Sequence, residues 1–370
     1  MRGITTGSLV GIIVLCIAAC SPESQSAAPT QNDVEPVKLT ILKISPELSD
    51  GDERTNLSGA ACAPSGQCLL AGDEKRFVRL FRLAGDTLVP GEPLFLLPDK
   101  DADGKEMKEA DTEGIAYSDG YFYIVGSHSN SKKAKVQQSR HFVARIPLRP
   151  AGGFEDLGSA GKPSGGLVMK NLDHLINAEP AFQPYLKHAA GELKSGGAGF
   201  TEDQHGPNIE GVAVTGDTMW VGFRGPVDSG GAFLYEIKLS QLFGGVPPTR
   251  ILHQLQLGST PDGIGQGVRD LAAVRDGLLI LAGPEMRSDP DPTPDQSVQC
   301  QRACPQPELF LWKMGQQPRR IADLGNRFKG DSPEAIVVLE ETNDVYRILL
   351  LSDGMARSEP VLLEVRKRAS

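Results

Sequence analysis

A pattern that occurs five times along the chain constrains the fold more than any other feature. Two copies read TEGIAYSDGYFYIVGSH, from Thr112, and IEGVAVTGDTMWVGFRG, from Ile209. The other three copies begin at Leu57, Val268 and Pro333. Each copy is a short apolar stretch, a turn rich in Gly, Asp, Asn or Ser, and a second apolar stretch. This pattern is typical of a β-hairpin.

The stretches between the copies complete a repeated four-stranded unit. Two more strand-like segments follow each of the first four copies, but only one, PVLLEVR, follows the fifth. The missing strand is supplied near the start by KLTILKIS, residues 38–45. Four-stranded repeats closed by an N-terminal strand are typical of β-propellers. We therefore predict an all-β fold, a single β-propeller of five four-stranded blades over residues 37–370.

The interval between the second and third copies is nearly twice as long as the others, which leaves a sixth blade open as an alternative. Residues 171–193 instead place Leu172, Leu175 and Ile176 at helical spacing, followed by Phe182 and Leu186. This spacing predicts a helical insertion over one face of a five-bladed ring.

The first 20 residues have the features of a secretory signal. Arg2 is followed by LVGIIVLCIAAC, an apolar run too short to span a membrane as a helix of the mature protein. Its end, Ala18-Ala19-Cys20, resembles the lipobox of bacterial lipoproteins. That resemblance implies lipidation of Cys20, including palmitate, a flexible tether over 21–36 and, because Ser21 follows, an outer-membrane location facing the periplasm. A plain signal peptide cleaved near Ala19 is the alternative.

Charge and cysteine content narrow the possible partners. A net charge of −9 argues against nucleic acid, because phosphate binding needs a basic surface. Beyond Cys20, four cysteines form two close pairs, Cys62 with Cys68 and Cys300 with Cys304. In an exported protein such pairs indicate disulfides. Zinc is the alternative, but neither spacing is that of a zinc site and no histidine lies beside either pair.

The charged residues that flank the hairpin strands are the candidates for function. In a propeller the first strand of each blade is innermost, and small residues such as Gly114 and Gly211 permit close approach of the backbones. The residues just before these small ones should then meet at one mouth of the central channel. We call this set the rim: Ser58, Glu113, Glu210, Arg269 and Glu334. A second set should lie beside it, at the ends of the second strands: Asp73, Glu74, His128, Arg224, Glu285 and Asp353.

Three carboxylates that converge on a narrow axis repel one another unless positive charge offsets them. A hard cation such as Ca²⁺, or another divalent ion, would do so and would take their oxygens as ligands. Arg224 and Arg269, the latter with Asp270, are the alternative source of positive charge. The sequence thus predicts a candidate metal site formed by Glu113, Glu210 and Glu334.

A second calcium candidate is the loop DKDADGKEMKEAD, in which Asp99, Asp101 and Asp103 match the start of a calcium-binding loop. Ala110 stands where such a loop needs a bidentate glutamate, so a solvated acidic turn remains the alternative.

The stretches DTEGIAYSDGYFYIVGSHS, NIEGVAV…WVGFRGPV and GVRDLAAV…LLILAGP together resemble a bacterial family catalogued as a domain of unknown function, over roughly residues 55–355. That resemblance implies an exported β-propeller. More distantly, the repeat is similar to phytase-like esterase propellers and to the gluconolactonase and strictosidine synthase-like group, which implies a divalent ion at the channel mouth. Ser58 and Arg269 depart from an acidic cage, so a complete metal site does not carry over.

Two classes of function follow. In the first, a lipid-anchored envelope propeller binds a small ligand at the rim, and an enzymatic version hydrolyses esters, lactones or phosphate esters with metal assistance. Glu113, Glu210, His128 and Arg224 are then the catalytic candidates, and Arg269, Asp270, Glu285, Glu334 and Asp73 bind the ligand. In the second, the propeller is a non-catalytic platform for an envelope protein or a glycan. The chain lacks G-x-S-x-G, P-loop and H-E-x-x-H patterns, so whether it is an enzyme stays open.

Overall fold

The computed structural model describes residues 38–45, 57–72, 74–131, 135–186, 206–260, 263–285, 307–325, 332–353 and 360–367. The chain divides into two units, Met1–Asp33 and Val34–Ser370, and every described residue belongs to the second. The expected signal peptide, tether and lipidated Cys20 lie outside the described residues. Within the described ranges no helix is both long and apolar enough to cross a bilayer.

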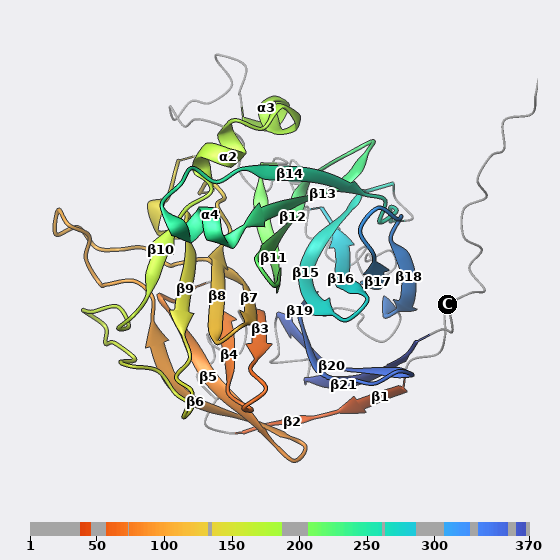
Figure 1. The fold of residues 1–370 in the computed structure, drawn as a ribbon, viewed down its shortest axis with the longest axis horizontal. Coiled ribbons are helices and arrows are strands. Elements are labelled where there is room, and N and C mark those ends of the chain that lie inside the picture. The colour runs from red at the N-terminus through yellow and green to blue at the C-terminus, as the bar shows by residue number, and fades with distance from the viewer. Residues whose placement is uncertain are drawn as a thin grey trace, which may run out of the picture. The chain divides into compact units, whose positions relative to one another are not determined.

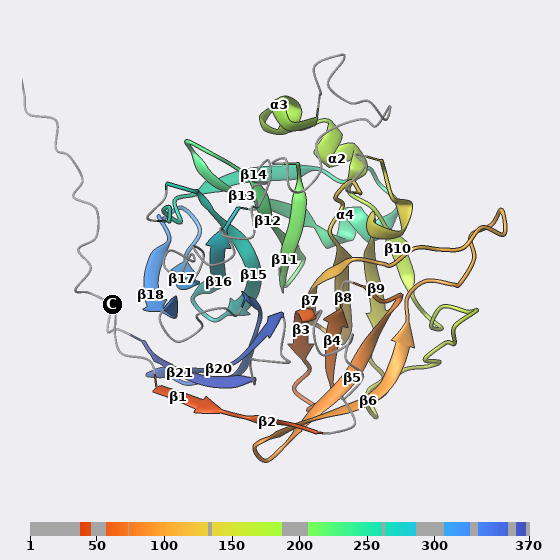
Figure 2. The same cartoon turned by 180° about the vertical axis from the view of Figure 1, so that it is seen from behind.

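Five sheets, one for each copy of the repeat, follow one another around a ring (Figures 1 and 2). The first contains β3 (Leu57–Cys62), β4 (Cys68–Gly72), β5 (Phe77–Ala84) and β6 (Thr87–Phe95). The second contains β7 (Thr112–Ser118), β8 (Tyr121–Gly126), β9 (Val143–Pro147) and β10 (Val168–Lys170). The third contains β11 (Asn208–Thr215), β12 (Thr218–Asp228), β13 (Gly231–Lys238) and β14 (Arg250–Leu255).

The fourth sheet contains β15 (Gln266–Val274), β16 (Gly277–Pro284), β17 (Glu308–Trp312) and β18 (Arg319–Asp323). The fifth contains β19 (Ser332–Glu341), β20 (Val345–Asp353), β21 (Val361–Arg366) and β1 (Lys38–Ile41). The first strand of every hairpin copy, β3, β7, β11, β15 or β19, contacts the equivalent strands of both neighbouring blades. The prediction of a five-bladed propeller with these strands innermost is confirmed.

The N-terminal strand closes the ring. Strand β1 pairs with β21 in antiparallel register, with Lys38 opposite Glu364, and so completes the fifth blade. This confirms the predicted closure. The chain then continues into β2 (Lys43–Ile44), which pairs in parallel with β6 at the outer edge of the first blade. The same short segment therefore joins the last blade to the first, a second attachment that the repeat pattern does not reveal.

The apolar core lies between the blades. Five clusters of buried side chains each combine residues of two neighbouring blades. Between the third and fourth blades, for example, the rings of Trp220 and Trp312 meet edge to face with centroids 5.4 Å apart. Because both faces of every blade are covered in this way, their strands carry apolar residues on both faces.

The predicted helical insertion is present between β10 and β11. It consists of α2 (Asp173–Asn177), η4 (Pro180–Phe182) and α3 (Gln183–Leu186), while residues 187–193 lie outside the described part. Phe182 is fully buried and packs against the rings of Phe223, Phe233 and Tyr235 of the third blade. The six-bladed alternative is wrong, since the described strands form five blades. Two further helices, η3 (Gln138–Arg140) and α4 (Leu239–Gly244), were not expected.

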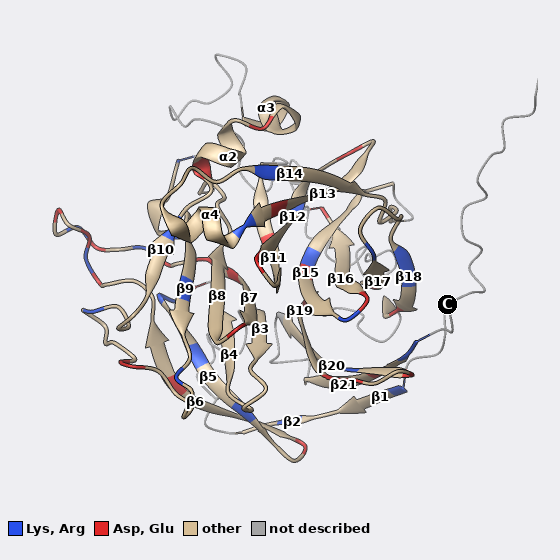
Figure 3. Cartoon of the chain, viewed as in Figure 1, with Lys and Arg blue, Asp and Glu red and all other residues tan. Residues whose placement is uncertain are grey.

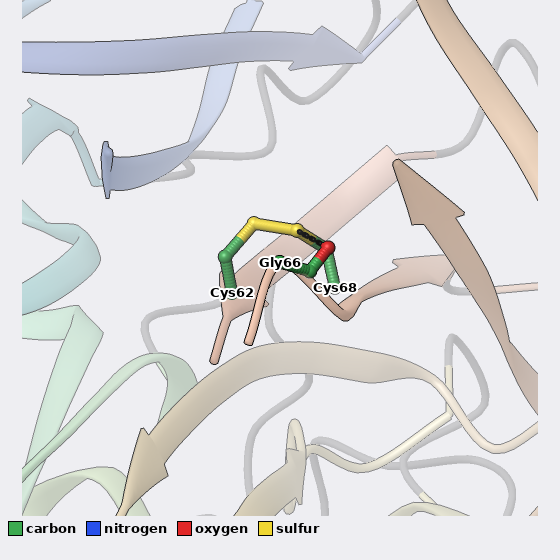
Figure 4. The surroundings of a disulfide bond; sticks show 3 residues. All are labelled: Cys62, Gly66 and Cys68. Atoms are coloured by element: carbon green, nitrogen blue, oxygen red, sulfur yellow. Dashed lines mark hydrogen bonds between the residues drawn. A yellow bond between two sulfur atoms is a disulfide. The ribbon is translucent and has the colours of Figure 1, made fainter. Parts of the chain in front are cut away.

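The predicted disulfide between Cys62 and Cys68 is present (Figure 4). It joins directly opposed residues of β3 and β4, the strands on either side of a tight turn. Cys300 and Cys304 lie outside the described residues, so their pairing stays a prediction.

Candidate functional site

Each rim residue lies at an irregularity of an inner strand. The register between the two strands of the hairpin shifts at Glu113, Glu210, Arg269 and Glu334, and the same shift spans Ser58 in the first blade. At such a β-bulge one strand has an extra residue, and its side chain is turned away from the regular alternation. The acid–glycine pairs Glu113-Gly114 and Glu210-Gly211 therefore lie at a bulge that all five blades share.

The residue after the bulge is small because the inner strands approach closely there. A Cβ built on Gly59 would lie 2.6 Å from the carbonyl oxygen of Glu113 in the next blade. One built on Gly114 would lie 3.1 Å from the carbonyl oxygen of Glu210, and one on Gly211 would lie 3.1 Å from the carbonyl carbon of Asp270. The expected reason for the glycines, crowding of backbones, is confirmed.

Arg269 connects two glutamates across the blades. Its Nε lies 2.9 Å from Oε2 of Glu210, although the N–H does not point at that oxygen, so this is a charge contact rather than a hydrogen bond. Its Nη2 forms an ion pair with Oε1 of Glu334. All three residues are buried, with relative exposures of 3% for Glu210, 3% for Arg269 and 8% for Glu334. The guanidinium thus links β11, β15 and β19 at the rim. Figure 3 shows an acidic segment on β11 and a basic segment on β15.

Arg224 supplies a second guanidinium beside the rim. Its Nη1 donates to Oε1 of Glu210 at 2.8 Å, and its Nε donates to the carbonyl oxygen of Pro284 at 3.2 Å. Asn208 also donates to Oε1 of Glu210, at 3.1 Å. Glu285, as predicted, lies nearby and accepts the backbone N–H of Val227 at 3.0 Å. One carboxylate, that of Glu210, is therefore the centre of the polar network.

Asp270 takes the place that glycine or alanine has in the other copies. Its carboxylate accepts the backbone N–H of Leu271 at 2.7 Å and that of Ile336 in the next blade at 2.8 Å. The residue is 1% exposed. Burial raises the pKa of the Asp270 carboxyl well above its ordinary value, because the two backbone N–H groups only partly offset the lost hydration. Asp270 ties the fourth blade to the fifth directly below the rim.

His128 is buried and held by its two ring nitrogens. Nδ1 donates to the carbonyl oxygen of Gly126 at 3.0 Å, and Nε2 accepts the backbone N–H of Leu172 at 3.1 Å. Burial lowers the pKa of His128 to about 4, so the ring is neutral at pH 7. Its backbone is left-handed, with φ of 54°. His128 therefore holds the N-terminus of α2 in place. Beside it, Nδ1 of His141 lies 2.7 Å from Oδ1 of Asp173.

A buried polar network that the sequence did not suggest lies at the open end of the second hairpin. Asp111, also left-handed with φ of 50°, accepts hydrogen bonds from Ser127 and, at 2.9 Å, from Nη1 of Arg140. Arg140 donates through Nη2 to Glu109 as well, at 2.8 Å. Burial raises the pKa of the Asp111 carboxyl although Arg140 opposes that effect. One feature of the sequence could have indicated this network: the polar run Ser127–His128–Ser129 lies opposite an aspartate in a hairpin that is otherwise apolar.

The other predicted residues are placed less informatively. Glu113 and Ser58 are buried at their bulges, with 9% and 7% exposure. Asp73 lies outside the described residues, and so does the side chain of Asp353, whereas Glu74 is exposed. In the acidic loop, Asp99 pairs with Arg76 at 2.6 Å, and Oδ1 of Asp101 accepts the backbone N–H groups of Asp103 and Lys105.

The rim as it stands does not fit a divalent cation between Glu210 and Glu334, because the guanidinium of Arg269 lies between these carboxylates. Across the described residues, no group of three or more His, Cys, Asp or Glu side chains is arranged to hold a metal ion. A rim cation would require Arg269 to leave a buried site. The two calcium sites therefore stay predictions.

The chain was compared with known protein families. A family model described as protein of unknown function, DUF3616, matches residues 56–148 and 132–361. The chain belongs to this family. The match covers all five blades apart from β1, β2 and the part of β21 after Val361, so the bulged rim lies entirely within it. No curated protein matches the chain in sequence.

Several solved structures are similar at low identity. An exo-1,5-α-L-arabinanase from a bovine ruminal metagenomic library is 9% identical, with 85% of this chain and 97% of that chain covered and a TM-score of 0.43. A PQQ-bound aldose sugar dehydrogenase from Streptomyces coelicolor is 10% identical, with 90% and 99% covered and a TM-score of 0.39. A catalytically inactive virginiamycin B lyase from Staphylococcus aureus is 12% identical, with 89% and 99% covered and a TM-score of 0.37. At these scores they add nothing about substrate.

Proposed function

We propose that the chain is an envelope protein, anchored through lipidated Cys20, that binds a small polar ligand at the rim. The observation that carries the proposal is the position of Arg269, which is buried between Glu210 and Glu334 of two neighbouring blades. A buried network of opposite charges costs free energy of desolvation, so stability alone is a weak reason for it. A ring of donors and acceptors at the mouth of a channel is, by contrast, suited to recognising a ligand with several polar groups.

The charges of the site favour a neutral, hydroxyl-rich ligand. The rim has three glutamates and one arginine, and Arg224 and Glu285 beside it add one charge of each sign. The balance is negative, so a phosphate ester or other anion would be repelled. Hydroxyl groups both donate and accept, and so can use glutamate and arginine together. Of the substrate classes predicted from the sequence, sugar lactones and neutral esters fit this balance better than phosphate esters.

The enzymatic form of the proposal assigns hydrolysis to these groups without a metal-dependent step. Glu113 is the general base that takes a proton from the water that attacks the carbonyl carbon, and Arg224 with Arg269 donates to the carbonyl oxygen on which negative charge develops. The bond to the alcohol oxygen then breaks, and Glu113 returns its proton to that oxygen as the alcohol leaves. His128 does not serve as the base in this scheme, since both its ring nitrogens are held by backbone groups. Its contribution is to seat α2.

The test uses the unit Val34–Ser370 with D-glucono-1,5-lactone, p-nitrophenyl acetate and p-nitrophenyl phosphate as probes. We expect the lactone or the acetate to raise the melting temperature or to be hydrolysed, and Glu113→Gln to abolish the effect. Glu340→Gln is the matched control, because Glu340 is an exposed acid of β19 paired with Arg347 at 2.9 Å. A preference for the phosphate ester, or equal responses of Glu113→Gln and the unmodified chain, would contradict the proposal. No response to any probe would leave the non-catalytic platform as the better account.

A second arm of the test addresses the cation. Melting is followed in EDTA and then with added Ca²⁺, Mg²⁺ or Mn²⁺, because a ligand specific to the native state raises its stability. A metal-induced rise that is lost when Glu113→Gln and Glu210→Gln are combined would establish a rim metal site and a rearranged Arg269. A rise that survives both changes would assign the metal to the loop containing Asp99, Asp101 and Asp103 instead. With Arg269 in place, we expect neither.

A further inference from the structure

An arginine on the second blade lies among three aromatic side chains. Arg145 is in β9, directly opposite Tyr123 of β8. Its guanidinium lies over the ring of Tyr121, 4.9 Å from the centroid, and over that of Phe243, 4.4 Å from the centroid. The Tyr123 ring lies beside both, at 6.4 Å from Tyr121 and 6.2 Å from Phe243. Because Phe243 belongs to α4 of the third blade, the guanidinium packs against aromatic rings from two blades.

This arginine is at the opposite end of the strands from the rim. Tyr121 is the first residue of β8, whereas the bulge at Glu113 lies opposite the last, Gly126. Helix α4 begins against the turn between β11 and β12, since the N–H of Leu239 donates to the carbonyl oxygen of Asp217. Both views place α4 beside β9 and β10 (Figures 1 and 2). The aromatic group is therefore a feature separate from the rim.

The charge of Arg145 has no carboxylate partner in the part of the chain that the structure describes. Arg250 provides a comparison, because it lies over the ring of Tyr235 and also pairs with Glu179 at 2.8 Å. No such ion pair joins Arg145 to a described acid. Arg145 is half-buried, and an arginine stays charged at any pH at which the protein is folded. A positive charge is thus left unmatched in a largely apolar setting.

One acid, Asp119, acts on this group of side chains from a distance. Burial raises the pKa of the Tyr123 hydroxyl, while Arg145 opposes that rise and Asp119 adds to it. Asp119 is exposed, and its carboxylate accepts the hydroxyl of Ser118 at 3.0 Å. A guanidinium has five N–H donors, more than the hydroxyls of Tyr121 and Tyr123 can engage. Some of them are therefore available to an acceptor from outside the chain.

Apolar side chains lie on the surface next to this charge. Val168 is directly opposite Arg145 on β10, the outer strand of the blade, and is 39% exposed. Tyr121 and Phe243 are half-buried, and Val246, which follows α4, is 55% exposed. Arginine and aromatic residues carry much of the binding energy in protein interfaces. A fitting partner has a carboxylate for the guanidinium and an apolar side chain beside it.

We propose that Arg145, Tyr121 and Phe243 form a docking site for a peptide segment that presents a carboxylate beside an apolar side chain. The carboxylate binds the planar fork of the guanidinium, and the apolar side chain covers Val168 and the two rings. The carboxylate belongs either to an Asp or Glu within the peptide or to its C-terminus, since both offer the same chemistry. The rings hold the guanidinium in place before binding, so little side-chain freedom is lost.

A peptide suits this end of the propeller better than an anionic membrane surface does. The exposed Asp119 and Asp217 lie in the two hairpin turns there, and they would repel a plane of negative headgroups. A single carboxylate can approach the guanidinium between them. The site goes beyond the function proposed for the rim and does not depend on it.

The experiment titrates the full chain with two pairs of short peptides and measures Kd by isothermal titration calorimetry. The first pair is N-acetyl-Leu-Glu-Leu-amide and the same peptide with Gln in place of Glu. The second pair is N-acetyl-Gly-Gly-Leu with a free C-terminus and its C-terminal amide. We expect the acid of at least one pair to bind about ten- to a hundredfold more tightly than its neutral form, the usual effect of a hydrogen bond to a charged group. The pair that shows the difference identifies the source of the carboxylate.

Three variants assign the effect to the site. Arg145→Gln should abolish the difference between acid and neutral peptides, and its melting temperature shows whether it is folded. Arg149→Gln is the matched control, because Arg149 is exposed just beyond the end of β9. We expect it to bind as the unmodified chain does. Asp119→Asn should bind the acid peptide more tightly, since a nearby negative charge is removed.

Equal affinities within both pairs, or no binding of either acid at millimolar concentration, would overturn the proposal whether or not a variant folds. A preference for the acid that survives Arg145→Gln would also contradict it, because the carboxylate would then bind elsewhere. Vesicles of phosphatidylglycerol should not sediment with the chain in a way that Arg145→Gln abolishes. If they do, an anionic lipid and not a peptide is the partner. None of these variants changes a rim residue, so failure here leaves the function proposed for the rim untouched.

Discussion

At the scale of single residues, Arg269 is the group on which the rim depends most. Replacement by glutamine removes the positive charge between Glu210 and Glu334 and leaves two buried carboxylates close together. Removing one partner of a buried ion pair typically costs about 3–5 kcal/mol. We expect Arg269→Gln to lower the free energy of unfolding by about that amount in urea denaturation.

The matched control for this substitution is Arg347→Gln. Arg347 pairs with Glu340 at 2.9 Å, but both side chains are nearly half exposed. Exposed pairs contribute about 0–1 kcal/mol. Combining Arg269→Gln with Glu334→Gln should restore part of the lost free energy of unfolding, because the double variant no longer buries the Glu334 carboxylate without its positive partner. Equal costs for Arg269→Gln and Arg347→Gln would show that the rim charges are solvated rather than buried.

His128 makes stability depend on pH in a definite direction. Burial lowers its pKa from 6.5 to about 4, so between these values the unfolded chain binds a proton that the folded protein does not. The free energy of unfolding therefore rises with pH from about 4 to 6.5, and acidification removes up to about 3 kcal/mol. The groups facing the ring are His141 and Asp173, the latter with a pKa held down by its bond to His141 although burial opposes this.

The measurement is the urea midpoint at several pH values between 4.5 and 7.5 for the unmodified chain and for His128→Asn. Asparagine tolerates the left-handed backbone at this position, where φ is 54°. We expect a smaller pH dependence in the variant. A slope that is unchanged by the substitution would mean that other groups, and not His128, take up the proton.

At the scale of elements, the bulges are what the sequence left undetermined. The hairpins and their order followed from the repeated pattern, because alternation and turn residues are local properties of the chain. A one-residue register shift is set by the contacts between strands, and it decides which way a side chain faces. For this reason the sequence placed Glu210 and Arg269 on one rim and gave the arginines as one of two sources of positive charge there, but it did not predict which carboxylate each arginine contacts. His128 turned toward α2 for a similar reason, since its left-handed backbone is not encoded by spacing.

The small residue after each bulge gives an element-scale prediction. A methyl group at Gly59 would meet backbone atoms of Glu113 and Gly114 at 2.6 and 2.9 Å, and backbone cannot move aside as a side chain can. We expect Gly59→Ala to cost about 1–3 kcal/mol, the usual range for overpacking. The measurement is the urea midpoint, with Gly161→Ala as the control because a Cβ there meets nothing within 4 Å. If both variants are equally stable, the close approach of the inner strands is not a constraint.

At the scale of the whole molecule, the repeat explains both the closed ring and its single rim. Five equivalent inner strands bring residues that are 55 to 276 positions apart in the chain to one level of the axis, as Ser58, Glu113 and Glu334 illustrate. The features specific to individual blades, such as Asp270 in place of glycine and the α2–α3 insertion, are superimposed on this plan. These features make the five blades differ from one another at the site. The repeat pattern does not predict them, because it describes only what the blades share.

Closure of the ring depends on a segment of only eight described residues, 38–45. In it, β1 completes the fifth blade by pairing with β21, and β2 pairs with β6 of the first. Without these residues, β21 and β6 become uncovered strand edges, and the two blades are joined by the apolar side chains packed between them and by the contact of their inner strands. We expect a chain beginning at Pro46 to unfold at lower urea concentration than a chain beginning at Lys38. The shorter chain should also associate through its exposed edges, which size-exclusion chromatography would detect. Because the two chains share every rim residue, equal stability would show that the inner contacts alone hold the ring closed.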